Sequence, residues 1–209
     1  MSMSARLARP GDLTAIVGLR RHLADWLALQ GSNQWQRAWP DEHGQIRRIE
    51  EAIDDRATWV VCEGDRVMAT VTFFDYDVGR LWAEMGGGRE PALYIHRMMV
   101  HRDYAGLGVG ADILEAAHLY AAYRGLAWLR LDAWATNVKL HRYYGRHHFV
   151  LVGHVPDSVL ERPDMTGFPS SALFQRRVRA VPGEQEKDLP SAGAGGVLRR
   201  GILPARSRG

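Results

Sequence analysis

The stretch from Leu93 to Ala121 constrains the fold of this chain more than any other. An apolar run of strand type, Leu93–Val100, passes through a short polar link into three glycines at alternate positions, Gly106, Gly108 and Gly110. Apolar residues at helical spacing follow, so the pattern predicts a strand, a tight turn and a helix. The first N–H groups of a helix have no intrahelical partner and carry partial positive charge, and glycine leaves them uncovered. This order of elements is typical of a phosphate-binding site.

The glycines alone do not identify the bound group. A Walker loop is excluded because no Gly-Lys-Ser/Thr follows, and Ala111 replaces the third glycine of the dinucleotide pattern. A plain helix-entry loop remains an alternative on this feature. The next segment favours a functional turn, because Ala127–Trp134 alternates like a strand and is followed by Asn137, Tyr144 and Phe149.

Together these pieces resemble the GNAT superfamily, whose members transfer acetyl groups from acetyl-CoA. In that family a central strand ends in a Val-like residue and an R/Q-x-x-G-x-G/A turn opens the next helix. One strand later an Asn is followed by a Tyr and then by a Phe. The matching residues here are Val100, Ala105-x-x-Gly108-x-Gly110, Asn137, Tyr144 and Phe149. The chain departs from the pattern at Ala105, where Arg or Gln is usual, and at His148, where Gly is usual. Neither change removes a backbone amide that would face pyrophosphate.

The resemblance implies an α/β fold with a GNAT-like mixed central sheet, whose central strands splay apart and are flanked by helices. We expect one domain over residues 1–180 and a mobile tail over residues 181–209, where Pro, Gly, Ala and Arg dominate without periodicity. An irregular insert at Asp75–Gly88 is a candidate mobile loop on the substrate side. The other elements expected from the pattern are a strand at Ala5–Pro10, a helix ending near Leu29, a helix from Pro40-Asp41, and strands at Thr58–Cys62, Arg66–Phe74, Phe149–Val155 and Ala172–Arg179.

The resemblance also implies acetyl-CoA as a cosubstrate. The N–H of Met98 would hold the thioester oxygen, and Val100 would pair with the pantetheine arm like an added strand. Asn137 would bond pantetheine, cap the following helix, or do both. Tyr144 would donate to the departing thiolate, with Tyr143 as its packing rival. The full set of expected cofactor contacts is Met98, Met99, Val100, Ala105, Gly106, Leu107, Gly108, Val109, Gly110, Asn137 and Tyr144.

A general base is needed because an alkyl amine, with a pKa near 10.4, is almost wholly protonated at pH 7. His96 is the first candidate, since imidazole titrates near neutrality and alternation would place it on one face with Met98 and Val100. Glu84 and a water chain are the alternatives. The expected catalytic set is therefore Tyr144, His96 and Met98. No metal site is predicted, because the other histidines are scattered and the His147-His148 pair lacks carboxylate or cysteine partners at ligand spacing.

The acceptor is expected to be a small-molecule amine or a peptide amino terminus. Trp35 and Trp39 stand in a loop that would cover the acceptor side in this family, and their faces would attract a cationic amine. Tyr94 and His96 on the central strand complete the predicted substrate contacts. These residues do not identify the amine.

Bulk properties narrow the class of partner. The net charge is only +3 at pH 7 and no clustered basic stripe stands out, so no nucleic-acid partner is expected. Cys62 is the single cysteine, and no apolar run reaches membrane-spanning length, so we expect a cytoplasmic protein without membrane contact. Two other functions stay open, a CoA-binding regulatory protein that has lost catalysis and acetylation of a macromolecule such as aminoacyl-tRNA. The sequence also leaves a homodimer open.

Overall fold

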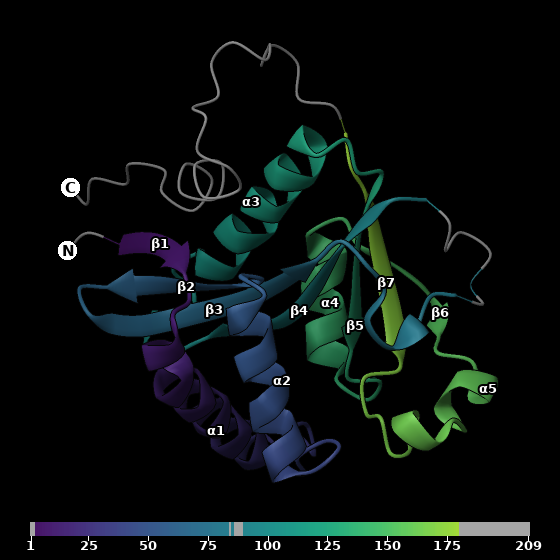
Figure 1. Ribbon diagram of the computed structural model, residues 1–209, viewed down its shortest axis with the longest axis horizontal. Helices are drawn as coiled ribbons and strands as arrows, with labels where there is room; N and C mark the ends of the chain where they lie inside the picture. Colours follow the sequence, from purple (N-terminus) through teal and green to yellow (C-terminus); the bar gives the residue numbers. More distant parts are fainter. Residues whose placement is uncertain (1–2, 84, 86–89, 180–209) are drawn as a thin grey trace.

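The computed structural model describes residues 3–83, 85 and 90–179. Within them the chain forms one seven-stranded mixed sheet with helices on both faces, which confirms the predicted α/β class (Figure 1). The strands are β1 (Met3–Leu7), β2 (Thr58–Glu63), β3 (Arg66–Phe74), β4 (Ala92–Val100), β5 (Trp128–Ala133), β6 (Val150–His154) and β7 (Ala172–Arg177). The α-helices are α1 (Leu13–Leu29), α2 (Glu42–Asp54), α3 (Val109–Tyr123), α4 (Val138–Arg146) and the short α5 (Asp157–Leu160).

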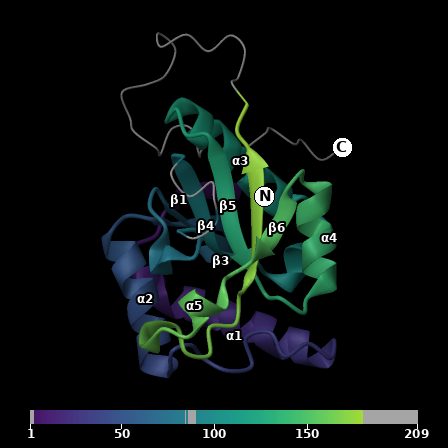
Figure 2. The ribbon, with the colours of Figure 1, turned by 90° about the vertical axis from the view of Figure 1, so that its right-hand side faces the viewer.

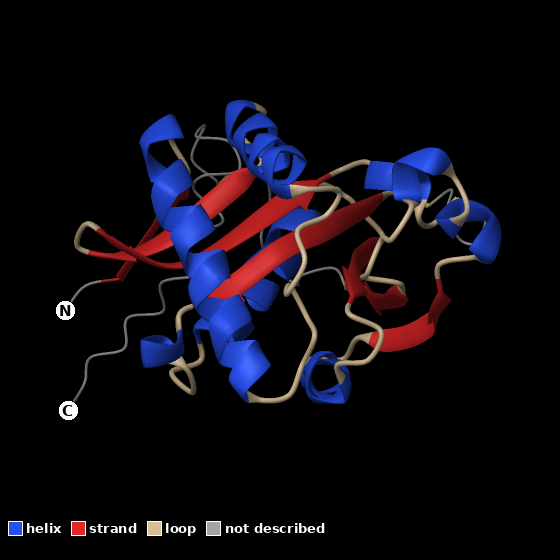
Figure 3. Ribbon diagram, turned by 90° about the horizontal axis from the view of Figure 1, so that it is seen from below, coloured by secondary structure: helices blue, strands red, loops and turns tan. Residues whose placement is uncertain are grey.

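The helices divide between the two faces of the sheet. Helices α1 and α2 lie on one face and α3 on the other, as seen in Figures 1 and 3. Figure 2 shows α2 and α4 on opposite sides of the strands. The core divides in the same way, because Ile113 and Tyr144 pack with one set of strand residues, whereas Ile16 and Ile49 pack with another. Each face of the sheet therefore has its own apolar layer.

The two central strands separate at their carboxyl ends. Strands β4 and β5 run parallel and pair from Ala92 opposite Trp128 to Ile95 opposite Leu131. Beyond that point β4 continues to Val100 and β5 to Ala133, but the two strands no longer pair with each other. Strand β7 lies between β5 and β6 and closes the far half of the sheet. The separation leaves backbone groups of β4 free on the edge that faces β5.

A bulge in β4 overturns one expectation. Thr70 pairs with Met99 and Thr72 with His96, so the single residue between them on β3 faces both Arg97 and Met98. Arg97 takes up the extra residue with a left-handed backbone, φ 49°. The bulge reverses the side-chain alternation.

The residues on either side of the bulge show the reversal. Before it, Leu93 and Ile95 pack on the α3 face, and after it Met98 and Val100 do. The prediction that His96 shares a face with Met98 and Val100 is therefore wrong. His96 lies on the α1–α2 face with Tyr94.

Candidate active site

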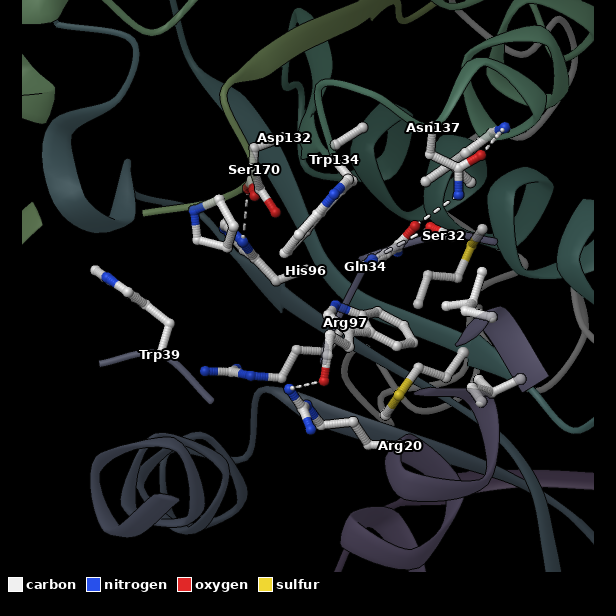
Figure 4. Close-up of a pocket in the computed structure, with 18 of the residues that line it drawn as sticks. Arg20, Ser32, Gln34, Trp39, His96, Arg97, Asp132, Trp134, Asn137 and Ser170 are labelled. Atoms are coloured by element: carbon white, nitrogen blue, oxygen red, sulfur yellow. Dashed lines mark hydrogen bonds and ion pairs between the residues drawn. The ribbon is translucent and has the colours of Figure 1, made fainter. Parts of the chain in front are cut away.

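A cavity of about 1120 Å³ lies where β4 and β5 separate. Its wall draws on α1, the loop between α1 and α2, β4, β5, α4 and the segment before β7. Figure 4 shows labelled side chains from these elements converging on the space. A region this large has room for a cosubstrate arm and a small acceptor together.

The glycine turn stands beside this cavity rather than in its lining. Gly108 is the N-cap of α3 with a left-handed backbone, φ 84°, and Gly106 has φ 80°. Neither position tolerates a side chain without strain. Leu107 between them is 41% exposed. The turn thus presents the first amides of α3 at the surface, as the phosphate-binding pattern requires.

Two tyrosines on α4 line the cavity, and one of them reaches this turn. Tyr144 is buried, and its ring packs against Phe149 and Phe174. Burial raises the pKa of Tyr144, with a smaller contribution from Tyr143. Tyr143 lies closer to the turn, because a Cβ at Gly110 would stand 2.5 Å from its Oη. Burial raises the pKa of Tyr143 to about 12. Both hydroxyls are therefore protonated donors at neutral pH.

Asn137 caps α4 and also bridges two loops. Its side-chain oxygen accepts from the N–H of Leu140 at 3.0 Å, while its Nδ2 donates to Gln34 Oε1 at 2.6 Å. A second contact between the same loops joins Trp134 Nε1 to Asn33 Oδ1 at 2.8 Å. The loop between α1 and α2 is thus held against the loop between β5 and α4, across the mouth of the separated strands.

His96 forms a dyad with Asp132 on β5. The two groups lie 3.2 Å apart, Nδ1 to Oδ1, and both side chains are mostly buried (Figure 4). A carboxylate at Nδ1 favours the tautomer with the proton on that nitrogen, which leaves Nε2 as the acceptor. Nε2 is buried without a hydrogen-bond partner among the described residues. As the surrounding groups stand, Nε2 is not accessible to an amine.

The residues predicted to contact the acceptor differ in where they lie relative to the cavity. Trp35 and Trp39 line the cavity, but an arginine covers one face of each, Arg20 at 5.9 Å and Arg48 at 4.1 Å from the ring centroids. Each arginine stands over only one face of its ring, so the role of Trp35 and Trp39 as substrate contacts stays a prediction. Tyr94 is buried in the core away from the cavity wall, where Arg130 donates to its Oη at 3.2 Å. Tyr94 therefore does not line the cavity, and its role as a substrate contact stays a prediction.

Other expectations fall outside what can be located. Glu84, part of the insert before β4 and the residues after 179 lie outside the described residues. Among the described residues no three His, Cys, Asp or Glu side chains are grouped as a metal would require. No helix in the described part of the chain is both long and apolar enough to cross a bilayer.

Asp132, Arg97 and Gln34 were not expected at the site. Asp132 could have been found from the sequence. It is a carboxylate within a buried strand, and its side chain lies on the opposite face of that strand from Leu131. Aspartate is rarely buried unless it is paired. Arg97 interrupts the apolar run of β4, which is a weaker signal. Nothing local to Gln34 indicates that it would meet Asn137.

Known proteins give a consistent comparison. A profile of the acetyltransferase (GNAT) family matches residues 20–149. The chain is 30% identical over 146 residues to the uncharacterized N-acetyltransferase YesJ of Bacillus subtilis (strain 168), covering 68% of this chain and 78% of that protein. An acetyltransferase of the GNAT family from Listeria monocytogenes 4b F2365 has a similar structure, with a TM-score of 0.63, 23% identity and coverage of 84% and 94%. The PaiA N-acetyltransferase of Thermoplasma acidophilum, solved in complex with coenzyme A, has a TM-score of 0.60, 14% identity and coverage of 85% and 99%.

Proposed function

Since the chain belongs to the acetyltransferase (GNAT) family, we propose that it transfers the acetyl group of acetyl-CoA directly to a primary amine. The observation that carries the proposal is the separation of β4 from β5, with a buried His–Asp dyad on one side and a helix N-terminus on the other. This arrangement brings an activated acyl group and a deprotonating group to one point.

The residues present fit acetyl-CoA as the donor. The left-handed N-cap at Gly108 leaves the first amides of α3 open to an anion, and the free edge of β4 can pair with an amide-bearing arm. Bound there, acetyl-CoA would supply a thioester, which is an acyl group activated for attack.

The chain's own groups divide the remaining work. His96 Nε2 takes the proton of the ammonium group, while Asp132 holds the ring and offsets the charge that the imidazole gains. The amine then forms the N–C bond and the C–S bond breaks, with the electron pair leaving on sulfur. The backbone N–H of Met98 on the free edge of β4 donates to the carbonyl oxygen as negative charge develops there.

Tyr144 assists the leaving group through a hydrogen bond. A thiol with a pKa near 8.5 is more acidic than a free tyrosine, so full transfer of the tyrosine proton is uphill by roughly 2 kcal/mol. Burial raises the pKa of Tyr144 further and makes full transfer less favourable still. Tyr144 therefore stabilises the thiolate, and solvent or the imidazolium supplies its proton.

The experiment is release of free thiol from acetyl-CoA in the presence of a panel of primary amines, with mass spectrometry of the products. We expect an N-acetylated product from at least one amine. Asp132→Asn should lower kcat/KM roughly 10²-fold, within the usual range for loss of general-base catalysis, without loss of acetyl-CoA binding. Binding of acetyl-CoA without turnover of any free amine would contradict the proposal and favour a regulatory protein. Turnover of aminoacyl-tRNA alone would favour the macromolecular alternative.

A further inference from the structure

Three arginines from three different elements face the acceptor side of the cavity. Arg20 comes from α1, Arg48 from α2 and Arg97 from the bulge of β4, and all three line the space. Figure 4 shows Arg20 and Arg97 in the same region as His96 and Trp39. We call Arg20, Arg48 and Arg97 the arginine cluster.

Arg97 is the member with the clearest unmet requirement. Its Nη1 is buried and has no hydrogen-bond partner among the described residues. Burial and the nearby charge of Arg48 lower the pKa of Arg97 to about 10, so the guanidinium is still charged at neutral pH. A buried cation without a hydrogen-bonded counter-ion is unfavourable, and an incoming anion would relieve that cost.

Asp132 and, from α2, Glu51 act on Arg97 at longer range, but neither forms a hydrogen bond with its Nη1. The described part of the cavity wall carries six arginines and one lysine, against the single carboxylate of Asp132. Asp132 is already engaged 3.2 Å from His96. The local field therefore favours a ligand that carries negative charge.

The aromatic residues hold the cluster in place. The guanidinium of Arg48 stacks over Trp39 at 4.1 Å, and Trp39 is fixed in turn by a hydrogen bond to the carbonyl of Thr166. Arg20 lies over the Trp35 ring and donates to the Trp35 carbonyl at 3.3 Å. A guanidinium stacked as that of Arg48 is can still form planar, bidentate bonds to a carboxylate through its edge.

The phosphates of acetyl-CoA are not the natural partners of this cluster. The glycine turn that suits them opens α3, which packs on the opposite face of the sheet from α1 and α2 (Figure 1). The bulge directs Arg97 toward Arg48 of α2, while Met98, the next residue, packs on the α3 face. The cluster and His96 thus share the acceptor side.

We propose that the acceptor is a free amino acid, whose carboxylate binds the arginine cluster through Arg97 while its amine faces His96. This inference rests on the proposed function and narrows its substrate class. The carboxylate would fix the position of the amine and satisfy the buried guanidinium at the same time.

The test compares acceptors that differ in one charge. Phenylalanine, phenylalaninamide and phenethylamine form one set, and leucine, leucinamide and isoamylamine a second. For wild type we expect the amino acid to have the highest kcat/KM in its set, by roughly tenfold to a hundredfold, because charged hydrogen bonds are lost without the carboxylate. The amide is a demanding control, since it keeps the size and the α-amine but loses the negative charge.

Variants of the arginine cluster test whether it causes the preference for the amino acid. Arg97→Gln should raise KM for the amino acid at least tenfold and reduce its kcat/KM advantage over phenethylamine by a similar factor. Arg48→Gln should act in the same direction. Arg47→Gln is the matched control, because Arg47 precedes Arg48 on α2, is exposed and does not line the cavity. A wild-type preference for the amide or the simple amine would overturn the inference, and so would an Arg97→Gln enzyme with an undiminished preference for the amino acid.

A binding measurement separates this inference from the proposed function. With CoA present, N-acetylphenylalanine should raise the melting temperature of wild type but not of Arg97→Gln, and N-acetylphenethylamine should raise neither. Turnover of amines without any preference for a carboxylate would contradict the inference and leave the proposed function standing. If no amine is turned over, the proposed function fails, and the melting comparison still decides whether the cluster binds a carboxylate.

Discussion

At the scale of single residues, neighbouring side chains of one type have different environments and hence different expected roles. Tyr143 and Tyr144 are consecutive on α4, yet one reaches the first turn of α3 and the other is buried against Phe149 and Phe174. Asp12 and Asp103 both pair with arginine, but only Asp12 does so in a largely buried, bidentate geometry. These contrasts provide matched pairs of variants.

Tyr144→Phe and Tyr143→Phe should separate catalysis from packing. Each change removes one hydroxyl and keeps the ring. We expect Tyr144→Phe to lower kcat roughly 10²-fold while acetyl-CoA binds as before, because the lost bond forms mainly in the transition state. Tyr143→Phe should change kcat by only a few-fold. Steady-state kinetics with calorimetric binding measures both, and equal losses of kcat in the two variants would remove Tyr144 from the mechanism.

Asp12 should contribute stability that depends on pH. The hydrogen bonds from Arg6, at 2.6 and 2.8 Å, hold the pKa of Asp12 below its ordinary value. A carboxylate with a lowered folded-state pKa stabilises the protein above its unfolded pKa, near 3.9, and loses that contribution as pH falls through the folded value. Asp12→Asn should therefore lower the free energy of unfolding by about 1 kcal/mol at pH 7, and by less below pH 4.

Urea denaturation of both proteins between pH 7 and pH 3 measures this difference. Asp103→Asn is the control, since its ion pair with Arg66 is exposed on both sides and should change stability little. A gap between wild type and Asp12→Asn that is the same at every pH would show that the effect is not electrostatic.

At the scale of elements, the fit between α3 and α4 depends on one glycine. Gly110 lies in the first turn of α3, and an added Cβ would stand 2.5 Å from Tyr143 Oη but 3.5 Å from the next ring atom. The absence of a side chain there lets the two helices approach. This contact joins the glycine turn to the helix that carries both tyrosines.

Gly110→Ala should therefore be destabilising unless the hydroxyl is removed as well. Alanine in a helix is ordinarily favoured over glycine by about 1 kcal/mol. Gly18→Ala on α1, where a Cβ meets nothing within 4 Å, should show that gain. Gly110→Ala should not show this gain in stability, because its Cβ would meet the Tyr143 hydroxyl. Adding Tyr143→Phe should restore the gain, with a coupling of about 1 kcal/mol in the double-mutant cycle. Additive effects would mean that the contact does not limit the packing.

The sequence predicted the elements whose signals are local. Glycine spacing indicated the turn at Gly106–Gly110, and the apolar periods around it indicated β4 and α3. The bulge could not be predicted, because Arg97 is not a residue that prefers a left-handed backbone and alternation gives no sign of the extra residue. The covering of Trp35 and Trp39 depends on Arg20 and Arg48, which come from separate helices. The pairing of His96 with Asp132 depends on how two parallel strands align, which local sequence does not determine.

At the scale of the whole molecule, the sheet stands between two layers, to which the proposed function assigns different substrates. The turn that suits acetyl-CoA opens a helix of the α3 face, while His96 and the arginine cluster lie on the α1–α2 side. The two meet where β4 and β5 separate. Binding on one side should therefore be measurable by its effect on the stability of the whole domain.

Acetyl-CoA should raise the melting temperature, because the unfolded chain has no turn to bind it. At a concentration one hundred times its dissociation constant the gain in unfolding free energy is about 2.7 kcal/mol, which corresponds to a shift of roughly 5–10 °C for a domain of this size. Gly108→Glu should abolish the shift by placing bulk and negative charge at the N-cap. Differential scanning calorimetry would decide, and an unmoved wild-type transition would rule out acetyl-CoA as the donor.

The bulge at Arg97 has a consequence for how enzymes of this kind diversify. Because it reverses the alternation of β4, the proposed function would give His96, just before the bulge, to the acceptor and Met98 and Val100, after it, to the donor. Substitutions that change the accepted amine could then accumulate on the α1–α2 side without altering the donor-binding surface on the α3 side. A new specificity could be acquired one substitution at a time, because each successive variant would still bind the same acyl donor.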